Sequence, residues 1–390
     1  MKNLLLFLLA CSLGAAAAAR PIRGSVKCGG KPMSGVAVTD SYTFTQSDEQ
    51  GIFTLDADDQ ALFISLVTPS GYLAPLDGGI PQFYRAYDPA AKRYDFELQP
   101  WPGSGECYEL LAIADPQPKT EEHFRRLRSE VMPALQAATA DGKTRGANQA
   151  AILLGDIVWD SPELFAGVKA EFAGLGVPVY GVIGNHDHIQ NAASDDLAVA
   201  EYEKYLGPTN YAVDLGQLHY IFLDDINMKD NSALSSSATG AYQNGLSDET
   251  LEWLRGHLAH IDKSKTLMVC AHSSLYKKID YNPSSTDLNA TAYTNLFSGY
   301  KYVHSWAGHQ HYHFNYAYAA EETGSRFANV ESHILGRSTG MLGLNASVNS
   351  CGTPRGYMVI EVEGENISWY YKPCNYEEGK TPNLTKEYQI

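Results

Sequence analysis

Acidic, amide and imidazole side chains recur in this sequence at the ends of short apolar runs. The runs LLAIAD, AAILLGD, VYGVIGNHD, TLMVCAH and YVHSWAGHQH carry Asp115, Asp156, Asn185, His272 and His309 at or near their ends. Such runs, broken by Gly and followed by polar residues, predict buried strands that end in loops. Because ligands collect at the carboxyl ends of strands in open α/β sheets, these strand ends predict one site for two divalent metal ions.

The composition is that of an ordinary globular chain. Its 390 residues are 44% hydrophobic and 19% charged, and the formal net charge is −16. A chain of this length can bury a substantial core divided over two or three domains. The negative charge repels nucleic acid and anionic membranes, so neither is expected as the main partner. An anionic substrate would need metal ions in the site to overcome the electrostatic repulsion from this net negative charge.

The N-terminus predicts export. A basic start, the apolar run LLLFLLACSLG and a series of alanines precede Arg20. This pattern is typical of a secretory signal peptide, here residues 1–19, and the run is shorter than the roughly twenty apolar residues of a membrane span. An alternative is a lipoprotein with an acylated Cys11. We expect a periplasmic or extracellular protein without a transmembrane span.

Five cysteines remain after the predicted signal peptide, and export would place them in oxidising surroundings. Cys351 and Cys374 are the better disulfide candidates because they are close in sequence, and Cys28 with Cys107 is a second candidate pair. Cys270 lies within a strand run and is expected to be a buried free thiol. Spacing alone does not determine connectivity.

Residues 20–100 consist of short alternating runs punctuated by Gly, Pro, Asp and Ser. This pattern predicts a small antiparallel β-sandwich. The phrase GSVKCGGKPMSGVAVTDS resembles the carboxypeptidase-regulatory-like sandwich of secreted bacterial proteins. Packing and spacing are its expected roles, with carbohydrate or partner binding as the alternative.

Residues 101–320 alternate strands with helices. The segment TEEHFRRLRSEVMPALQAAT has the spacing of an amphipathic helix capped by Thr120, and SPELFAGVKAEFAGLG is a second helix ending in Gly. The segment NYAVDLGQLHYIFLDD predicts a hairpin with Gly216 at its turn. The polar stretches 228–245 and 276–289 are predicted to be long loops that border an active site.

Residues 321–390 become β-like again. The segments RGYMVIEVEG and NISWYYK predict a further hairpin. This C-terminal region is either a small appended β domain or the last strands of the core.

The polar blocks together resemble the calcineurin-like metallophosphoesterase superfamily. Asp-x-Gln, Gly-Asp, Gly-Asn-His-Asp, His and Gly-His-x-His occur in that order between Asp115 and His311. One such block alone is a weak signal, whereas five at strand ends are a strong one. The whole chain resembles exported bacterial members with N- and C-terminal domains of their own. The resemblance implies an α/β (α+β) fold: a four-layer αββα sandwich with an N-terminal antiparallel β-sandwich and a short C-terminal β region.

The resemblance also implies a cofactor, two divalent ions of Mn, Fe or Zn bridged by Asp156. Six further side chains would complete the two sites: Asp115, Gln117 and His311 for one ion, and Asn185, His272 and His309 for the other. Oxygen and imidazole ligands suit these metals better than a thiolate-preferring metal. A hydroxide bridging the two ions would attack phosphorus in line.

Further residues receive roles around the metals by the same resemblance. His186 would sit over the phosphate, stabilise the developing charge and protonate the leaving oxygen. Asp187 would hold the His186 imidazole in the useful tautomer. Two further candidates come from their positions in the sequence and not from the resemblance. His188, directly after the Asn-His-Asp block, is a candidate to reach the substrate, and Tyr276, just past His272, is a candidate to line the pocket, with packing as the default role of a tyrosine here.

Other polar residues receive structural interpretations or none. His219, in the run LHYIFL, is expected in the core or behind the ligands, and Asp224 and Asp225 are expected to make structural hydrogen bonds. His304 and His333 are left unassigned.

Gln117 departs from the commoner Asp-x-His form of the first block, and an amide oxygen is a weaker ligand than imidazole. Subsets of the superfamily with Asp-x-Gln include enzymes that act on phosphodiesters and diphosphates. Trp159 stands where purple acid phosphatases carry a tyrosine ligand, which argues against a ferric-tyrosinate site. We expect a monomeric phosphoesterase for a small-molecule, glycan-linked or lipid-linked phosphodiester or diphosphate. The alternatives are a phosphomonoesterase on the same site and a catalytically degraded surface binding protein.

Overall fold

The computed structural model describes residues 20–103, 105–229, 242–276, 287–317, 328–339 and 354–374. The predicted signal peptide, with Cys11, lies outside the described residues. Among the helices in these ranges, none combines the length and the apolarity needed to cross a membrane.

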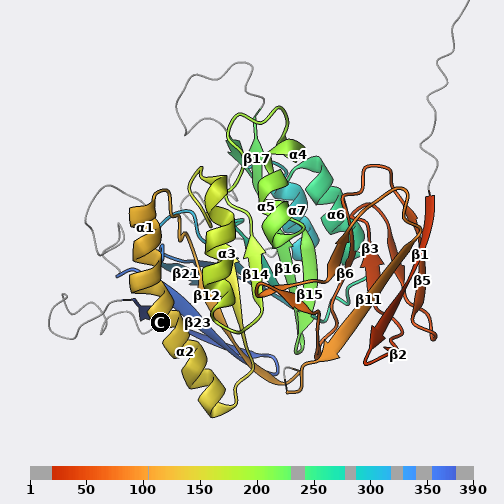
Figure 1. The fold of residues 1–390 in the computed structure, drawn as a ribbon, viewed down its shortest axis with the longest axis horizontal. Helices are drawn as coiled ribbons and strands as arrows, with labels where there is room; N and C mark the ends of the chain where they lie inside the picture. Colours follow the sequence, from red (N-terminus) through yellow and green to blue (C-terminus); the bar gives the residue numbers. More distant parts are fainter. Residues whose placement is uncertain are drawn as a thin grey trace, which may run out of the picture.

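The N-terminal module is built from short strands in two sheets (Figure 1). One sheet has the order β2-β1-β11-β7 with β5 also paired to β1, the other has the order β10-β6-β3-β4, and β8 pairs with β9. The strands are β1 (Arg20–Cys28), β2 (Lys31–Pro32), β3 (Ala37–Thr39), β4 (Phe44–Gln46), β5 (Ile52–Ala57), β6 (Phe63–Leu66), β7 (Tyr72–Leu73), β8 (Leu76–Asp77), β9 (Ile80–Pro81), β10 (Tyr84–Ala86) and β11 (Arg93–Pro100).

The sandwich is confirmed, but the expectation that it is wholly antiparallel is wrong. Strands β1 and β11 pair in parallel, with Val26 opposite Phe96. A parallel pair cannot be made by a hairpin and needs a crossover. Here the chain passes through the second sheet at β10 before β11 returns beside β1.

Two larger sheets form the centre of the molecule. The first has the order β14-β13-β12-β23-β24, and the second has the order β15-β16-β19-β20-β22-β21. Their strands are β12 (Cys107–Ile113), β13 (Gln149–Leu154), β14 (Val179–Val182), β15 (Tyr211–Leu215), β16 (Leu218–Leu223), β19 (Thr266–Ala271), β20 (Tyr302–Ala307), β21 (Phe314–Ala317), β22 (Val330–Ile334), β23 (Gly356–Glu363) and β24 (Asn366–Pro373). A separate pair joins β17 (Ile226–Met228) and β18 (Tyr242–Asn244).

The helices and short helical turns are α1 (Glu121–Arg126), η1 (Leu127–Val131), α2 (Met132–Arg145), η2 (Pro162–Leu164), α3 (Phe165–Ala173), α4 (Asp195–Ala198), α5 (Ala200–Leu206), α6 (Asp248–Leu258) and α7 (Ala290–Phe297). The first predicted helix begins where expected, because the Thr120 side chain accepts a hydrogen bond from the His123 N–H. It continues through the π-helical turn η1 into α2. The predicted hairpin of β15 and β16 turns at Gly216, whose φ is +58°.

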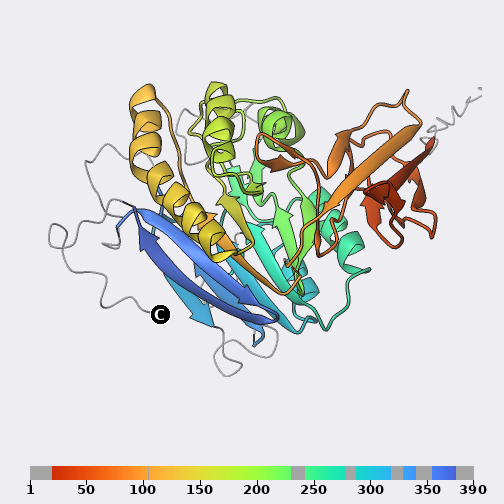
Figure 2. The same ribbon diagram turned by 60° about the horizontal axis from the view of Figure 1, so that its bottom comes forward.

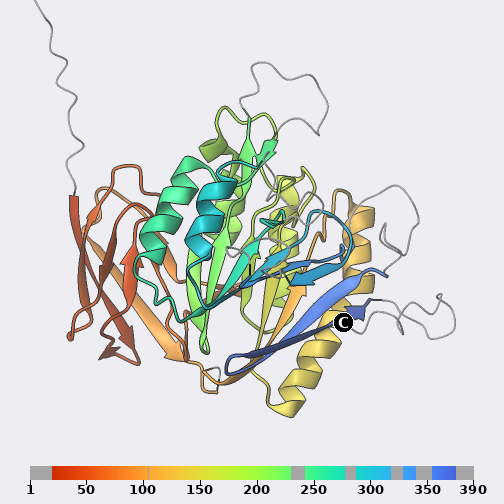
Figure 3. The same cartoon turned by 180° about the vertical axis from the view of Figure 1, so that it is seen from behind.

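The side chains of β12 show how the layers are made. Leu110 and Ala112 point into the core between the two sheets, whereas Leu111 and Ile113 pack under α1, α2, α3 and α5. This alternation is the period of two that a strand imposes. On the far side, α6 and α7 cover the outer face of the second sheet (Figure 3). The order helix, sheet, sheet, helix is the predicted αββα sandwich.

The C-terminal hairpin belongs to the core. Strand β23 pairs antiparallel with β12 along Cys107–Ala112, and β24 pairs with β23 at the sheet edge. Figure 2 shows this hairpin in blue beside the yellow helix α2, and the Tyr357 hydroxyl donates to the Ala134 carbonyl at 3.4 Å. The hairpin therefore supplies the last strands of the first central sheet.

The described cysteines are free thiols: Cys28, Cys107, Cys270 and Cys374. The candidate pair Cys28–Cys107 is not formed, since Cys28 ends β1 of the N-terminal module and Cys107 begins β12 of the central sheet. Cys374 is free and buried, and Cys351 lies outside the described residues. The expectation of a buried free thiol at Cys270 is confirmed.

Candidate metal centre

The two central sheets bring their strand ends together at one edge. Asp115 and Asp156 follow β12 and β13 of the first sheet, while His272 and His309 follow β19 and β20 of the second. The loops are tied to one another, because the Gly308 N–H donates to the His272 carbonyl at 3.0 Å. Neighbouring parallel strands end side by side, so residues distant in sequence become neighbours here.

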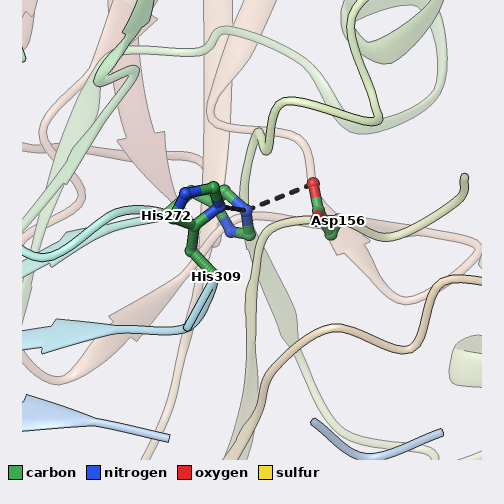
Figure 4. Close-up of side chains that lie close together, drawn as sticks. All are labelled: Asp156, His272 and His309. Atoms are coloured by element: carbon green, nitrogen blue, oxygen red, sulfur yellow. Dashed lines mark hydrogen bonds and ion pairs between the residues drawn. The ribbon is translucent and has the colours of Figure 1, made fainter. Parts of the chain in front are cut away.

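Asp156, His272 and His309 form the first group of side chains able to hold a metal (Figure 4). The His272 Nε2 lies 3.2 Å from the Asp156 Oδ1 and 3.2 Å from the His309 Nδ1. The Asn185 Oδ1 also lies 3.2 Å from the His272 Nε2. The His272 Nδ1–H donates to the Leu154 carbonyl at 2.8 Å, so in the neutral ring the lone pair of Nε2 faces the group.

Asp115, Asp156 and His311 form a second such group, which shares Asp156 with the first. The His311 Nε2 lies 3.2 Å from the Asp115 Oδ1. The Gln117 Nε2 donates to the Asp156 Oδ2 at 2.5 Å, while its Oε1 is buried without a hydrogen-bond partner. A buried acceptor left without a donor is costly, and a cation bound here would satisfy it. The donor set therefore fits metal ions.

The backbone at these residues is held in a strained conformation. The φ angles are +50° at Asp115, +43° at Gln117, +51° at Asp156, +65° at His309 and +55° at His311. Residues with a Cβ rarely adopt this left-handed region, and such strain gathers at active sites and ligand clamps. These strained conformations lower the stability of the fold, and they direct the five side chains toward one point.

Two glycines allow the loops to approach closely. A Cβ on Gly184 would lie 2.2 Å from the Asp156 nitrogen, and one on Gly308 would lie 2.6 Å from the Asp115 Oδ2. No side chain fits at either place. These glycines let the loops after β14 and β20 lie directly against the two carboxylates.

The charges of the site favour cations. Burial alone would raise the pKa of Asp156, but the facing His272 imidazole outweighs it and holds that pKa well below the usual range. Burial favours neutral His272, yet Asp156 outweighs this effect and raises the pKa of His272 to about 10. Asp156 thus remains ionised, and its negative charge attracts cations to the imidazole nitrogens beside it.

His186 stands beside the metal centre with a partner that the sequence analysis did not identify. Its Nδ1 lies 2.9 Å from the Asp160 Oδ1, and its ring packs against Trp159 at a centroid distance of 4.4 Å, with the two ring planes tilted by 31°. The backbone N–H of His186 donates to the Asp156 Oδ1 at 2.9 Å. Burial favours the neutral ring, but the hydrogen bond to Asp160 and the negative charges of Asp156 and Asp160 together outweigh it and raise the pKa of His186. The signal in the sequence that could have identified Asp160 is its position, four residues after Asp156 on the same loop.

The expectation that Asp187 holds His186 is wrong. Asp187 is buried beneath the loop, where its carboxylate accepts hydrogen bonds from the N–H groups of Val158 at 2.9 Å and Gly184 at 2.8 Å. The turn formed by the Asp187 N–H and the Gly184 carbonyl directs this side chain inward. Asp187 therefore fastens the loop that carries Asn185 and His186.

His188 and Tyr276 do not face the site. The His188 Nδ1 donates to the Gly184 carbonyl at 2.8 Å, and its Nε2 lies 3.4 Å from the Asp224 Oδ2. Burial favours the neutral imidazole, but Asp224 outweighs it and raises the pKa of His188 to about 9. Tyr276 is 1% exposed and lies in the core under α7. Both side chains are buried in the protein, so we assign neither of them a contact with the substrate.

Tyr242 and Asp225 complete the surroundings. Tyr242 on β18 lies with its ring 6.1 Å from that of His309, and it comes from the stretch predicted to border the site. The Asp225 carboxylate accepts hydrogen bonds from the backbone N–H groups of His272 and Ser273, both at 3.0 Å. Asp225 thus has the structural role expected of it, which is to fix the end of β19.

Comparison with protein families gives three matches along the chain. Calcineurin-like phosphoesterase matches residues 108–313, the N-terminal domain of calcineurin-like phosphoesterase matches residues 20–101, and its C-terminal domain matches residues 337–389. A comparison with curated proteins finds no match.

Several solved structures resemble the fold at a distance. A purple acid phosphatase, PPD1, from yellow lupin (Lupinus luteus) seeds is 11% identical, with 87% of this chain and 67% of that chain covered and a TM-score of 0.47. The sulfate thiohydrolase SoxB of Thermus thermophilus is 13% identical, with 70% and 57% covered and a TM-score of 0.40. The NAD nucleotidase of Haemophilus influenzae is 10% identical, with 69% and 49% covered and a TM-score of 0.35. These similarities are too distant to bear on the substrate.

The family match covers more than half of the chain and includes every residue of the metal centre. Divalent metal ions follow from the family, and the clustered donors fit them. The chain belongs to the calcineurin-like phosphoesterase family and is a metal-dependent phosphoric ester hydrolase.

Proposed function

We propose that this protein hydrolyses a phosphodiester or a diphosphate with two divalent metal ions. The observation that carries the proposal is the pair of donor groups that share Asp156. Asp115, Gln117 and His311 would complete one ion's ligands, and three further residues would complete the other's: Asn185, His272 and His309. Two such ions supply Lewis acidity and hydroxide near neutral pH.

The chain's own residues would perform the remaining tasks. His186, with 18% of its side chain exposed, borders the metal centre and is held by Asp160. The raised pKa of His186 keeps a proton on the ring to higher pH, which suits a group that protonates the leaving oxygen. Asp160 and Trp159 fix the ring's tautomer and plane, so the Nε2–H is available for the substrate.

The Gln117 amide supports the choice of substrate. Its oxygen is a weaker ligand than imidazole, so the first ion would be held less tightly than in an Asp-x-His site. The Asp-x-Gln form resembles subsets of the superfamily that act on phosphodiesters and diphosphates, which favours these substrates over monoesters. The formal net charge of −16 makes the metal ions the attractive feature for an anionic phosphoester. We also propose that the protein is exported and acts as a monomer.

Hydrolysis of bis-p-nitrophenyl phosphate and p-nitrophenyl phosphate with Mn²⁺, Zn²⁺ and Fe²⁺ tests this function. We expect metal-dependent turnover that is faster on the diester and is lost with chelator. Asp156→Ala should lose metal and activity together, whereas His186→Ala should keep the metals and lose about 10²–10⁴-fold in rate. Faster monoester hydrolysis would favour the phosphomonoesterase alternative, and no turnover with any metal would support a degraded binding protein.

A further inference from the structure

We propose that His304, Glu331 and His333 form a separate zinc site between the central sheets. Among the described residues, their ligand atoms make up a group lying within 4.8 Å of one another, apart from the groups that contain Asp156. His304 lies on β20 three residues before the strand ends at Ala307, which is about 10 Å at about 3.3 Å per residue. His309, of the catalytic group, follows beyond that end. The cluster is therefore distinct from the catalytic metal centre.

Strand pairing places the three side chains on one face. In the parallel pair of β20 and β22, His304 is opposite Glu331 and Trp306 is opposite His333. The His304 Nδ1 lies 3.0 Å from the His333 Nε2 and 4.0 Å from the Glu331 Oε2. Ligand atoms around a tetrahedral zinc ion, at bonds of 2.0–2.1 Å, lie about 3.3 Å apart. Small side-chain adjustments would bring this group to that spacing.

The surroundings of His333 select the ring nitrogen that would bind. Its Nδ1–H donates to the Asn315 Oδ1 at 2.8 Å, which leaves the Nε2 lone pair facing His304. Trp306 stacks on the same ring at a centroid distance of 3.9 Å and an angle of 14°. Metal-binding histidines almost always donate their second N–H to an oxygen in this way.

The other two ligands are also prepared. The Tyr302 hydroxyl donates to the Glu331 Oε2 at 3.2 Å and so orients the carboxylate. His304 is 5% exposed and His333 is fully buried, and burial disfavours the charged form of an imidazole. The neutral imidazole is the form that binds metals. Two imidazoles and one carboxylate are a donor set that suits zinc.

A second histidine pair provides the matched control. The His219 Nε2 and the His257 Nε2 lie 2.8 Å apart, and the His219 Nδ1 lies 2.8 Å from the Asp214 Oδ1. This pair is equally buried, but in the described part of the chain no third ligand atom joins the two facing nitrogens. A hydrogen bond between the two rings accounts for their close approach without a cation.

Equilibrium dialysis against zinc of the full chain carrying Asp156→Ala tests the proposal, since this change removes the ligand shared by both catalytic groups. We expect one zinc per chain in this variant, none after adding His304→Gln, and one after adding His257→Gln instead. Equal zinc in the first two variants, or none in the first, would overturn the proposal. These results do not depend on whether the catalytic centre holds two metals.

Crystals of the unaltered chain grown with zinc provide a second test if the variants do not fold. We expect an anomalous peak between the His304 Nδ1 and the His333 Nε2. A map without density there, in crystals whose catalytic centre contains zinc, would show that the two rings are joined only by a hydrogen bond.

Discussion

Replacement of Asp160 by Ala should slow catalysis and shift its pH dependence, because Asp160 holds His186. The carboxylate lies 2.9 Å from the His186 Nδ1, and the two side chains are 25% and 18% exposed. Hydrogen bonds to charged groups contribute about 1.5–3 kcal/mol. Partial exposure favours the lower end, and about 1.4 kcal/mol corresponds to a tenfold change in rate. We therefore expect kcat to fall by about 10- to 100-fold in Asp160→Ala, less than in His186→Ala.

The pH profile distinguishes this role from a general loss of structure. Asp160 raises the pKa of His186 and so preserves its protonated form as pH rises. Without Asp160 the pKa falls, and the alkaline limb of the kcat profile should move to lower pH. Steady-state rates on bis-p-nitrophenyl phosphate between pH 5 and 10 measure this limb.

Asp187→Asn is the matched control for this prediction. The Asp187 carboxylate accepts hydrogen bonds from the backbone N–H groups of Val158 and Gly184, whereas the His186 Nδ1 pairs with Asp160. This variant should lose stability while its alkaline limb stays in place. An unchanged limb in Asp160→Ala, together with a shifted limb in Asp187→Asn, would refute the assignment of Asp160 and restore the role first expected of Asp187.

Three further predictions concern single residues. Gln117→His should bind the first metal more tightly, because imidazole is a better ligand than an amide oxygen; matching Mn²⁺ and Zn²⁺ affinities in titrations of the two forms would place Gln117 outside the ligand set. His188 has a folded pKa of about 9, above its unfolded value of about 6.5, so the stability it contributes is complete below about pH 6.5 and is lost as pH rises through 9. The free energy of unfolding, measured with denaturant at pH 7 and pH 10, should therefore differ less between the two pH values in His188→Gln than in the unaltered chain. Phe83 is 3% exposed and packs with its ring tilted against that of Tyr211 at a centroid distance of 4.8 Å, so Phe83→Ala should cost about 3 kcal/mol of unfolding free energy with kcat/KM unchanged. An unaltered urea midpoint would show that this contact does not stabilise the N-terminal module against the central domain.

Local patterns in the sequence predicted most of the fold, since strands and helices leave periodic signals. The apolar run LLAIAD and the cap at Thr120 are both signals within one element, and the structure confirms the strand and the helix start that they predict. The parallel pairing of β1 with β11 was missed because it joins strands far apart in the chain. No local pattern reports which strand returns beside which.

The same distinction between local patterns and long-range contacts applies to the residues of the candidate site. Residues that follow strand ends, such as Asp156 and His272, could be placed because the sheet gathers those ends. The inward turn of Asp187 could not, since it depends on which backbone N–H groups lie beneath the loop. The position of His188 could not be predicted for a related reason, because its imidazole faces Asp224, which follows β16 and is distant in the sequence.

An anomalous diffraction map of crystals grown with manganese would locate the ions of the catalytic centre. A dinuclear centre built on Asp156 gives two peaks that share this carboxylate, one bound by His272 and His309 and the other by Asp115 and His311, about 3.5–4 Å apart. A single peak, or two peaks that do not share the Asp156 carboxylate, would contradict a dinuclear centre built on this residue.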